Sequence, residues 1–258
     1  MRDLGLSEAI RAAGGVRQLA RQIGISQPSV SNWVRIPAER VVSVEAVTGV
    51  SRALLRPDLY GNIMTAGDID EVDAARAQEY ALLAALLMRA PDAKLLSKIS
   101  DMRADASPLG LAHAGLAEAA EKTGVESAER EFFELFIGLG RGELLPYGSY
   151  YLTGFLHERP LARLREDLAR FGIARAEGVV EPEDHAGILC EIMSGIAGGR
   201  LPAPPDSDRV IFDKHMAPWI RRFFTDLENA EAAVFYKRVG TLGRVFIDIE
   251  AQAFEIPS

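Results

Sequence analysis

Apolar residues recur at spacings of three and four along most of the chain, and this pattern predicts helices. Between Tyr80 and Leu87 the apolar positions surround most of the helix, which is therefore expected at the centre of a core. A run near the C-terminus alternates spacings of four and three, as in packed bundles, at Phe235, Val239, Leu242, Phe246 and Ile249. Residues 245–249 alone would also suit a short strand, but no partner strand is predicted. We therefore expect an all-α fold.

The first 60 residues carry shorter apolar repeats that are separated by glycines. A first helix, with Ser7 as its predicted cap, ends at Gly14 and Gly15, and a second helix ends at Gly24. A third helix begins at Ser26, and its inward positions are predicted at Val30, Trp33 and Val34. Two helices joined by a glycine turn, the second short and polar on its outer face, form the helix-turn-helix arrangement.

Residue types on the outer face of this third helix suit the major groove of DNA. Amide side chains pair with adenine and serine fits several bases, so the predicted base contacts are Gln27, Ser29 and Asn32. Arginines nearby are expected to contact phosphates, and these are Arg17, Arg21 and Arg35. The alternative is a helix-turn-helix that has lost DNA binding and serves as a docking module.

Charge divides the chain into two parts. Residues 1–60 hold eight arginines, no lysine and five acids, a net charge of +3, so residues 61–258 carry −11 to reach the total of −8. Such asymmetry predicts two domains with different partners. We expect a small helix-turn-helix domain at 1–60, a linker at 61–70 that is poor in periodicity, and a larger helical domain at 71–258.

Several kinds of chemistry lack their usual residues in this sequence. Cys190 is the one cysteine, so no internal disulfide is expected, and the longest apolar run, 81–88, is too short to span a membrane. The four histidines are far apart, with no metal-ligand spacing, and neither a phosphate-binding loop nor a serine-nucleophile elbow occurs. We expect a cytoplasmic protein that is not an enzyme and has no metal or cofactor.

One stretch of the larger domain concentrates aromatic and bend-forming residues. Residues 141–151, which read RGELLPYGSYY, contain three tyrosines, two glycines and a proline. Tyrosines at a bend place apolar ring faces beside hydroxyl groups, which is typical of surfaces that bind a polypeptide. The alternative is that the rings close the end of a helical core.

A second stretch, Glu181-Pro182-Glu183-Asp184-His185, precedes an apolar segment. Proline suits the first turn of a helix and acids suit its positive end, so we expect these residues to open the helix. His185 is then predicted to present an imidazole and a carboxylate together on the surface, for binding or proton transfer.

Between the two stretches lies a predicted amphipathic helix that starts at Arg159-Pro160 and ends at Gly172. Its inward residues are expected to be Leu161, Leu164, Leu168 and Phe171. Its outward residues are expected to form an ordinary solvated face at Arg163, Glu166, Asp167 and Arg170.

These two stretches resemble the signatures of one family. Residues 181–185 resemble the Glu-Pro-x-Asp-His signature of the TorD/DmsD family of molybdoenzyme maturation chaperones, and residues 145–151 are similar to its Pro-Tyr-x-Ser-x-Tyr segment. The resemblance covers about 70–256 and implies a TorD-like helical bundle. Leu145 stands where many members have a second proline.

Residues 1–60 resemble the YdaS-type, Cro-like family of DNA-binding antitoxins and repressors. The matching features are the glycine pair at 14–15, the recognition segment 26–33 and the segment 36–40 after it. This resemblance implies a DNA-binding domain fused to the larger one.

The resemblance to TorD/DmsD proteins implies that the chain binds an apo-molybdoenzyme, for example a formate dehydrogenase, or its twin-arginine leader before cofactor insertion. The chain could also form a homodimer. The residues expected to bind this client are Tyr147, Ser149, Tyr151, Glu181, Pro182, Asp184 and His185. The alternative function is a transcriptional regulator whose helical domain senses a ligand or a client protein.

Overall fold

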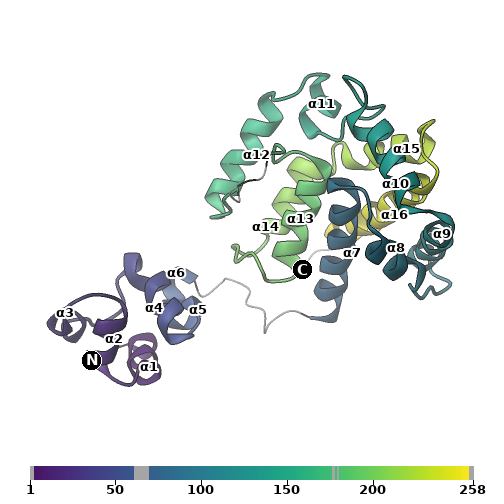
Figure 1. The fold of residues 1–258 in the computed structure, drawn as a ribbon. Helices are drawn as coiled ribbons and strands as arrows, with labels where there is room; N and C mark the ends of the chain where they lie inside the picture. The colour runs from purple at the N-terminus through teal and green to yellow at the C-terminus, as the bar shows by residue number, and fades with distance from the viewer. Residues whose placement is uncertain (1–2, 61–69, 176–177, 179, 256–258) are drawn as a thin grey trace. The chain divides into compact units, whose positions relative to one another are not determined.

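Helices form both parts of the chain in a computed structural model that describes residues 3–60, 70–175, 178 and 180–255. The chain divides into two compact units, 1–64 and 65–258 (Figure 1), which are described separately. The described residues contain helices, one isolated β-bridge and no β-strand, so the predicted all-α class is confirmed. The predicted linker at 61–70 lies outside the described residues except for Asp70.

The small unit packs short helices around one apolar core. Its elements are α1 (Leu4–Ala12), α2 (Val16–Gln22), α3 (Gln27–Ser31), η1 (Ala38–Arg40), α4 (Val41–Thr48), α5 (Arg52–Leu55) and α6 (Pro57–Tyr60). The largest fully buried side chains are Leu6, Leu19, Ile36 and Leu55, which come from separate segments. Gly5 lets α1 approach α5 closely, because a Cβ there would overlap the backbone of Leu55.

Two predictions for this unit are wrong in detail. Asp3, not Ser7, caps α1, since its Oδ1 accepts a hydrogen bond from the backbone N of Leu6 at 2.8 Å. Helix α3 ends at Ser31, and Val34 is 63% exposed instead of pointing inward. The reason is that the chain has already left the helix, and the carbonyl of Val34 accepts a hydrogen bond from the N of Asp3 at 2.9 Å.

The large unit is a bundle of longer helices (Figure 1). Its elements are α7 (Glu71–Met88), α8 (Ala93–Ser100), α9 (Pro108–Lys122), α10 (Val125–Phe132), the π-helical turn η2 (Phe133–Ile137), α11 (Gly148–Thr153), α12 (Arg159–Arg170), α13 (Ala186–Ala197), α14 (Ser207–Ile211), the π-helical turn η3 (Phe212–Met216), α15 (Ile220–Asn229) and α16 (Phe235–Glu255). The central helix α7 packs extensively against α13, and α16 packs against α15 and α9.

Helix α7 occupies the centre, as its apolar circumference predicted. Leu83 and Leu86 are fully buried. The hydroxyl of Tyr80, also fully buried, donates to Glu250 Oε2 in α16 at 2.9 Å, and the same carboxylate pairs with Arg76 at 2.9 Å. Residues 245–249 lie within α16, so the helical prediction for that segment is confirmed.

A buried carboxylate from another helix holds the start of α16. Glu131 in α10 is 6% exposed, and its two oxygens accept from the backbone N of Val234, Phe235 and Tyr236 at 2.7, 3.1 and 2.6 Å. These amides lie at the start of α16 and just before it, where no carbonyl of the same helix can accept from them. A side chain about one hundred residues away therefore satisfies them.

Candidate functional site

The two motif stretches of the large unit lie against each other. Tyr147 and His185 form an isolated antiparallel bridge, and the N of Ala186 donates to the carbonyl of Pro146 at 2.7 Å. The rings of Tyr147 and His185 meet edge to face, with centroids 5.1 Å apart. We call residues 146–151 together with 181–186 the tyrosine corner.

Within this corner, the acidic stretch does not open α13 as predicted. Helix α13 begins at Ala186, and His185 is its N-cap, with Nδ1 accepting from the N of Gly187 at 3.0 Å. Asp184 instead caps α11: its Oδ2 accepts from the N of Ser149 at 2.7 Å, and its carbonyl accepts from the N of Gly148 at 2.9 Å. Pro182 therefore lies in the turn before α13 and not in the first turn of that helix.

The prediction of a surface imidazole and carboxylate is also wrong. Ser149, Asp184 and His185 are 1%, 4% and 5% exposed. Burial lowers the pKa of His185 to about 4, against the opposing influence of the charges of Glu181 and Asp184, so the imidazole is neutral near pH 7. Its role in the described structure is to accept a hydrogen bond, which stabilises the start of α13.

Two buried polar atoms of the corner have no hydrogen-bond partner among the described residues. They are Ser149 Oγ and Asp184 Oδ1. The other oxygen of Asp184 is engaged at the start of α11, so the carboxylate is only half satisfied.

Groups at the surface of the corner are the tyrosines and Glu181. Tyr147 is partly buried, and its hydroxyl donates to Glu181 Oε2 at 2.7 Å. Tyr151 donates to Asp226 Oδ2 at 3.0 Å, and burial together with that carboxylate raises its pKa well above the ordinary range. Partly exposed rings beside carboxylates can bind a polypeptide that carries both apolar and cationic groups.

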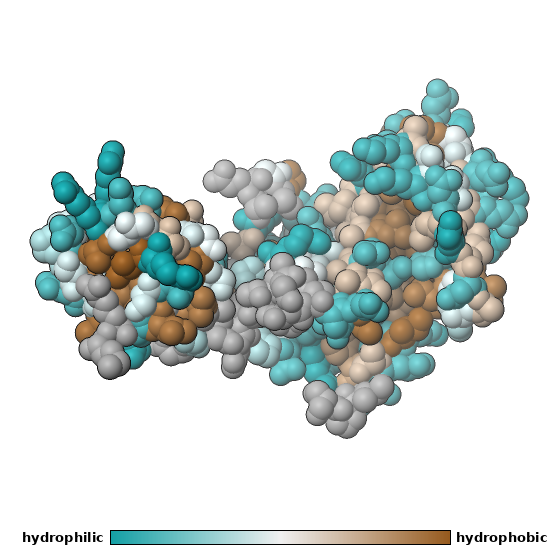
Figure 2. All heavy atoms as spheres, turned by 90° about the horizontal axis from the view of Figure 1, so that it is seen from below, coloured by the Kyte–Doolittle hydropathy of each residue, from teal (hydrophilic) through white to brown (hydrophobic). Residues whose placement is uncertain are grey.

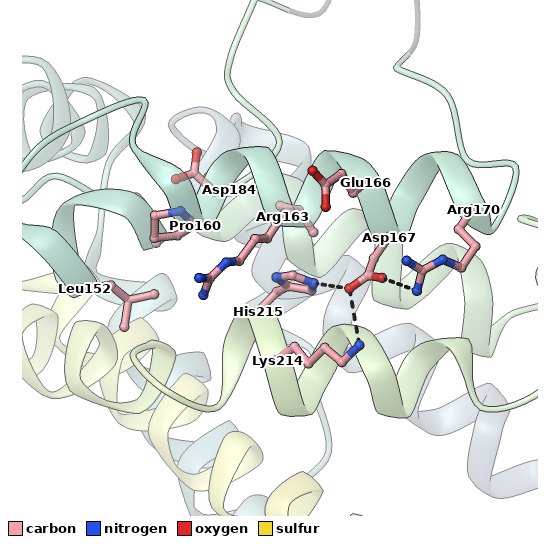
Figure 3. A pocket seen from close by; sticks show the side chains of 11 residues that line it. Leu152, Pro160, Arg163, Glu166, Asp167, Arg170, Asp184, Lys214 and His215 are labelled. Atoms are coloured by element: carbon pink, nitrogen blue, oxygen red, sulfur yellow. Dashed lines mark hydrogen bonds and ion pairs between the residues drawn. The ribbon is translucent and has the colours of Figure 1, made fainter.

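A cavity of about 450 Å³ opens beside the corner (Figure 3). Its lining includes Gly148 and Asp184 from the corner, together with residues of α12 and η3. At its base Asp167 Oδ2 lies 3.0 Å from His215 Nε2, and Arg170 and Lys214 also reach this carboxylate, at 2.8 and 3.5 Å. Figure 3 shows these three side chains converging on Asp167.

Asp167 was predicted on a solvated face, but it is only 6% exposed. Burial alone would raise its pKa, and the hydrogen bond with His215 and the charges of Lys214 and Arg170 outweigh burial and lower it. Sequence reasoning missed this cluster because Asp167 and His215 are 48 residues apart and neither belongs to a motif. The one local signal is an acid three residues before an arginine in α12.

The six residues that sequence reasoning assigned to DNA all lie on the surface of the small unit. Arg17 and Arg21 are in α2, Gln27 and Ser29 are in α3, and Asn32 and Arg35 follow α3. Arg17, Arg21 and Gln27 line one shallow hollow between α2 and α3. The predicted helix-turn-helix thus presents amide and guanidinium groups together.

Family models match both units. Residues 103–225 match the family of the nitrate reductase delta subunit, and this range contains the whole tyrosine corner. Residues 6–64 match the family described as bacterial toxin YdaS. The chain therefore joins two units with different family relationships, as the two resemblances implied.

The larger unit is similar to TorD chaperones. The chaperone protein TorD of Vibrio cholerae is 25% identical over 126 residues, which cover 45% of this chain and 57% of that protein. TorD of Aliivibrio fischeri is 24% identical over 132 residues, which cover 47% of this chain and 61% of that protein. The chain thus spans about three fifths of the length of the curated relatives it matches.

A solved structure from Archaeoglobus fulgidus, described as a candidate redox enzyme maturation protein, also matches. It is 21% identical, with a TM-score of 0.45, and the match covers 67% of this chain and 93% of that one.

Among the helices of the described residues, none combines the length and the hydropathy that a bilayer-spanning segment requires.

Proposed function

We propose that the large unit is a cytoplasmic chaperone that binds an apo-molybdoenzyme, or its twin-arginine leader, before the cofactor is inserted. The observation that supports this most is the meeting of residues 146–151 and 181–186 in one corner, since these are the stretches that resemble the TorD/DmsD signatures. The similarity to TorD chaperones across 126 residues supports it as well. The protein performs no chemistry on the client in this proposal.

Charge and surface character support a client of this kind. A leader with two arginines and an apolar helix would be attracted to a domain whose sequence carries a net charge of −11. On the face shown in Figure 2, hydrophilic residues of the large unit separate smaller hydrophobic areas. At the corner, Glu181 offers a carboxylate beside the ring of Tyr147, so a guanidinium could pair with the acid and stack on the ring.

This proposal predicts a loss of client binding when the surface of the corner is changed. Tyr147→Phe combined with Glu181→Gln removes a hydroxyl and a charge without removing the ring. We expect about a tenfold weaker Kd for a twin-arginine leader peptide, which corresponds to about 1.4 kcal/mol. Titration calorimetry with the peptide measures this, and Glu158→Gln, an exposed acid outside the corner, is the matched control.

Unchanged affinity in a folded double variant would contradict the assignment of the corner. The more drastic change of Asp184 to alanine is a poor test of binding, because it would leave the start of α11 without its cap. Capture of a molybdoenzyme subunit from native cells by the full chain would identify the client.

We propose a second function, DNA binding, for the small unit. The exposure of all six predicted contact residues on or beside α2 and α3 favours it over a docking module. Arginine suits bidentate contacts with phosphate, and Gln27 at the start of α3 would be the first base contact in this proposal. A chain with both functions could act as a regulator whose DNA binding responds to its client.

For this function we predict a change in salt dependence. Arg17→Gln and Arg21→Gln should each reduce the slope of log K against log salt by about 1, because each removes one phosphate contact. Gln27→Ala should lower sequence selectivity and leave the slope unchanged. Gel shifts of the full chain at several salt concentrations, with selected operator and random DNA, measure both, and no binding at low salt would contradict the proposal.

A further inference from the structure

A leucine two residues after the end of η2 is almost fully exposed. Leu139 is 98% exposed, and two neighbouring apolar side chains, Ile137 and Phe133, are 54% and 39% exposed. Single exposed leucines are common, but here three large apolar side chains are exposed within seven residues of the chain. We call these three residues the Leu139 patch.

The backbone holds this patch in a defined shape. The N of Gly138 donates to the carbonyl of Phe133 at 2.7 Å, and in the loop that follows the N of Glu143 donates to the carbonyl of Glu134 at 3.0 Å. Gly138 has a φ of +63°, and a Cβ at this position would overlap the backbone of Arg141. A loop that is ordered in advance loses little conformational entropy when a partner binds to it.

Acidic side chains lie next to the patch. Glu126, Glu129 and Glu134 are exposed, and in the described part of the chain no hydrogen bond or ion pair is found for their carboxylate groups. They line a hollow of about 380 Å³ together with Arg130 and the ring of Phe133. The hollow therefore carries three carboxylates and one guanidinium around an aromatic ring.

We propose that the Leu139 patch docks an amphipathic helix of a partner protein, with an apolar stripe flanked by lysine or arginine. Apolar residues of the helix would cover Leu139 and Ile137, and a flanking cation would lie over Phe133 among the three carboxylates. The charge of the hollow selects a basic helix over an acidic one. This docking does not depend on the tyrosine corner or on the function proposed for it.

The test uses the full chain and two synthetic helical peptides with the same leucine stripe. One peptide carries lysine and arginine beside the stripe, and the other carries glutamate at the same positions. Fluorescence anisotropy should show binding of the basic peptide and at least tenfold weaker binding of the acidic one. The double variant Ile137→Ser with Leu139→Ser should weaken binding of the basic peptide at least tenfold. The double variant Glu129→Gln with Glu134→Gln should weaken this binding about threefold.

Matched variants distinguish binding at the Leu139 patch from nonspecific hydrophobic binding and from binding at the tyrosine corner. Phe155→Ser removes another side chain that is 70% exposed and should leave the affinity unchanged. Tyr147→Phe with Glu181→Gln should also leave it unchanged. Equal binding of both peptides, or no effect of the double serine variant, would overturn the proposal. Self-association of the chain, measured by analytical ultracentrifugation and abolished in the double serine variant, would also overturn the proposal. The patch would then bind a second copy of this chain.

Discussion

Glu131→Ala is expected to lower the free energy of unfolding of the large unit by about 3 kcal/mol or more. The carboxylate accepts hydrogen bonds from three backbone amides at the start of α16, and alanine would leave the buried ones among them without a partner. An unsatisfied buried amide costs about 1–3 kcal/mol, and the acid also favours the positive end of the helix. The first turn of α16 should fray, and Phe235 and Tyr236 would lose part of their packing.

The loss in the free energy of unfolding is measured by urea denaturation, with tryptophan fluorescence as the probe. The chain has two tryptophans, one in each unit, so a Trp33→Phe background leaves Trp219 as the reporter of the large unit. Glu131→Gln keeps one acceptor oxygen and should show a smaller loss. Glu129→Ala, an exposed acid on the same helix, should change stability by less than about 0.5 kcal/mol. A loss for Glu131→Ala no larger than for Glu129→Ala would contradict the capping role.

Lowering the pH from 7 to 4 is expected to remove about 3 kcal/mol of stability through His185 alone. Its pKa is lowered by burial from 6.5 to about 4, so between these values the unfolded chain binds a proton that the folded chain does not. Stability from this group is thus fully present above pH 6.5 and is lost as the pH falls toward 4. Nδ1 now accepts a hydrogen bond from the amide of Gly187. Protonation would turn Nδ1 into a donor and break this hydrogen bond.

The matched variant for this measurement is His185→Asn, whose side-chain oxygen retains an acceptor for an N-cap. The free energy of unfolding is measured for both proteins between pH 7 and 4, and the value for His185→Asn is subtracted from the value for the unchanged protein, so that the contributions of the other titrating groups cancel. This difference should fall by about 3 kcal/mol as the pH falls across this range. A flat difference curve would show that the imidazole remains solvated or keeps a proton in the folded state.

Apolar spacing and glycine positions by themselves determined most of the helical architecture. The patterns at 80–87 and 235–249 lie in α7 and α16, and the glycines at 14–15 and 24 end α1 and α2. These features depend on neighbours within about four residues, which a linear pattern contains. The two motifs also indicated the tyrosine corner, although spacing alone does not show that residues 146–151 and 181–186 touch.

Tertiary structure alone decided which groups are buried and which helix each acid caps. Asp184 was expected to open α13, but it caps α11 through a contact between residues 35 positions apart, and Glu131 reaches Tyr236 across 105 positions. His185 and Asp167 look like surface residues in the sequence and are almost completely buried. The physical reason is that a carboxylate accepts from whichever free amide the packing brings near, and local sequence does not specify that partner.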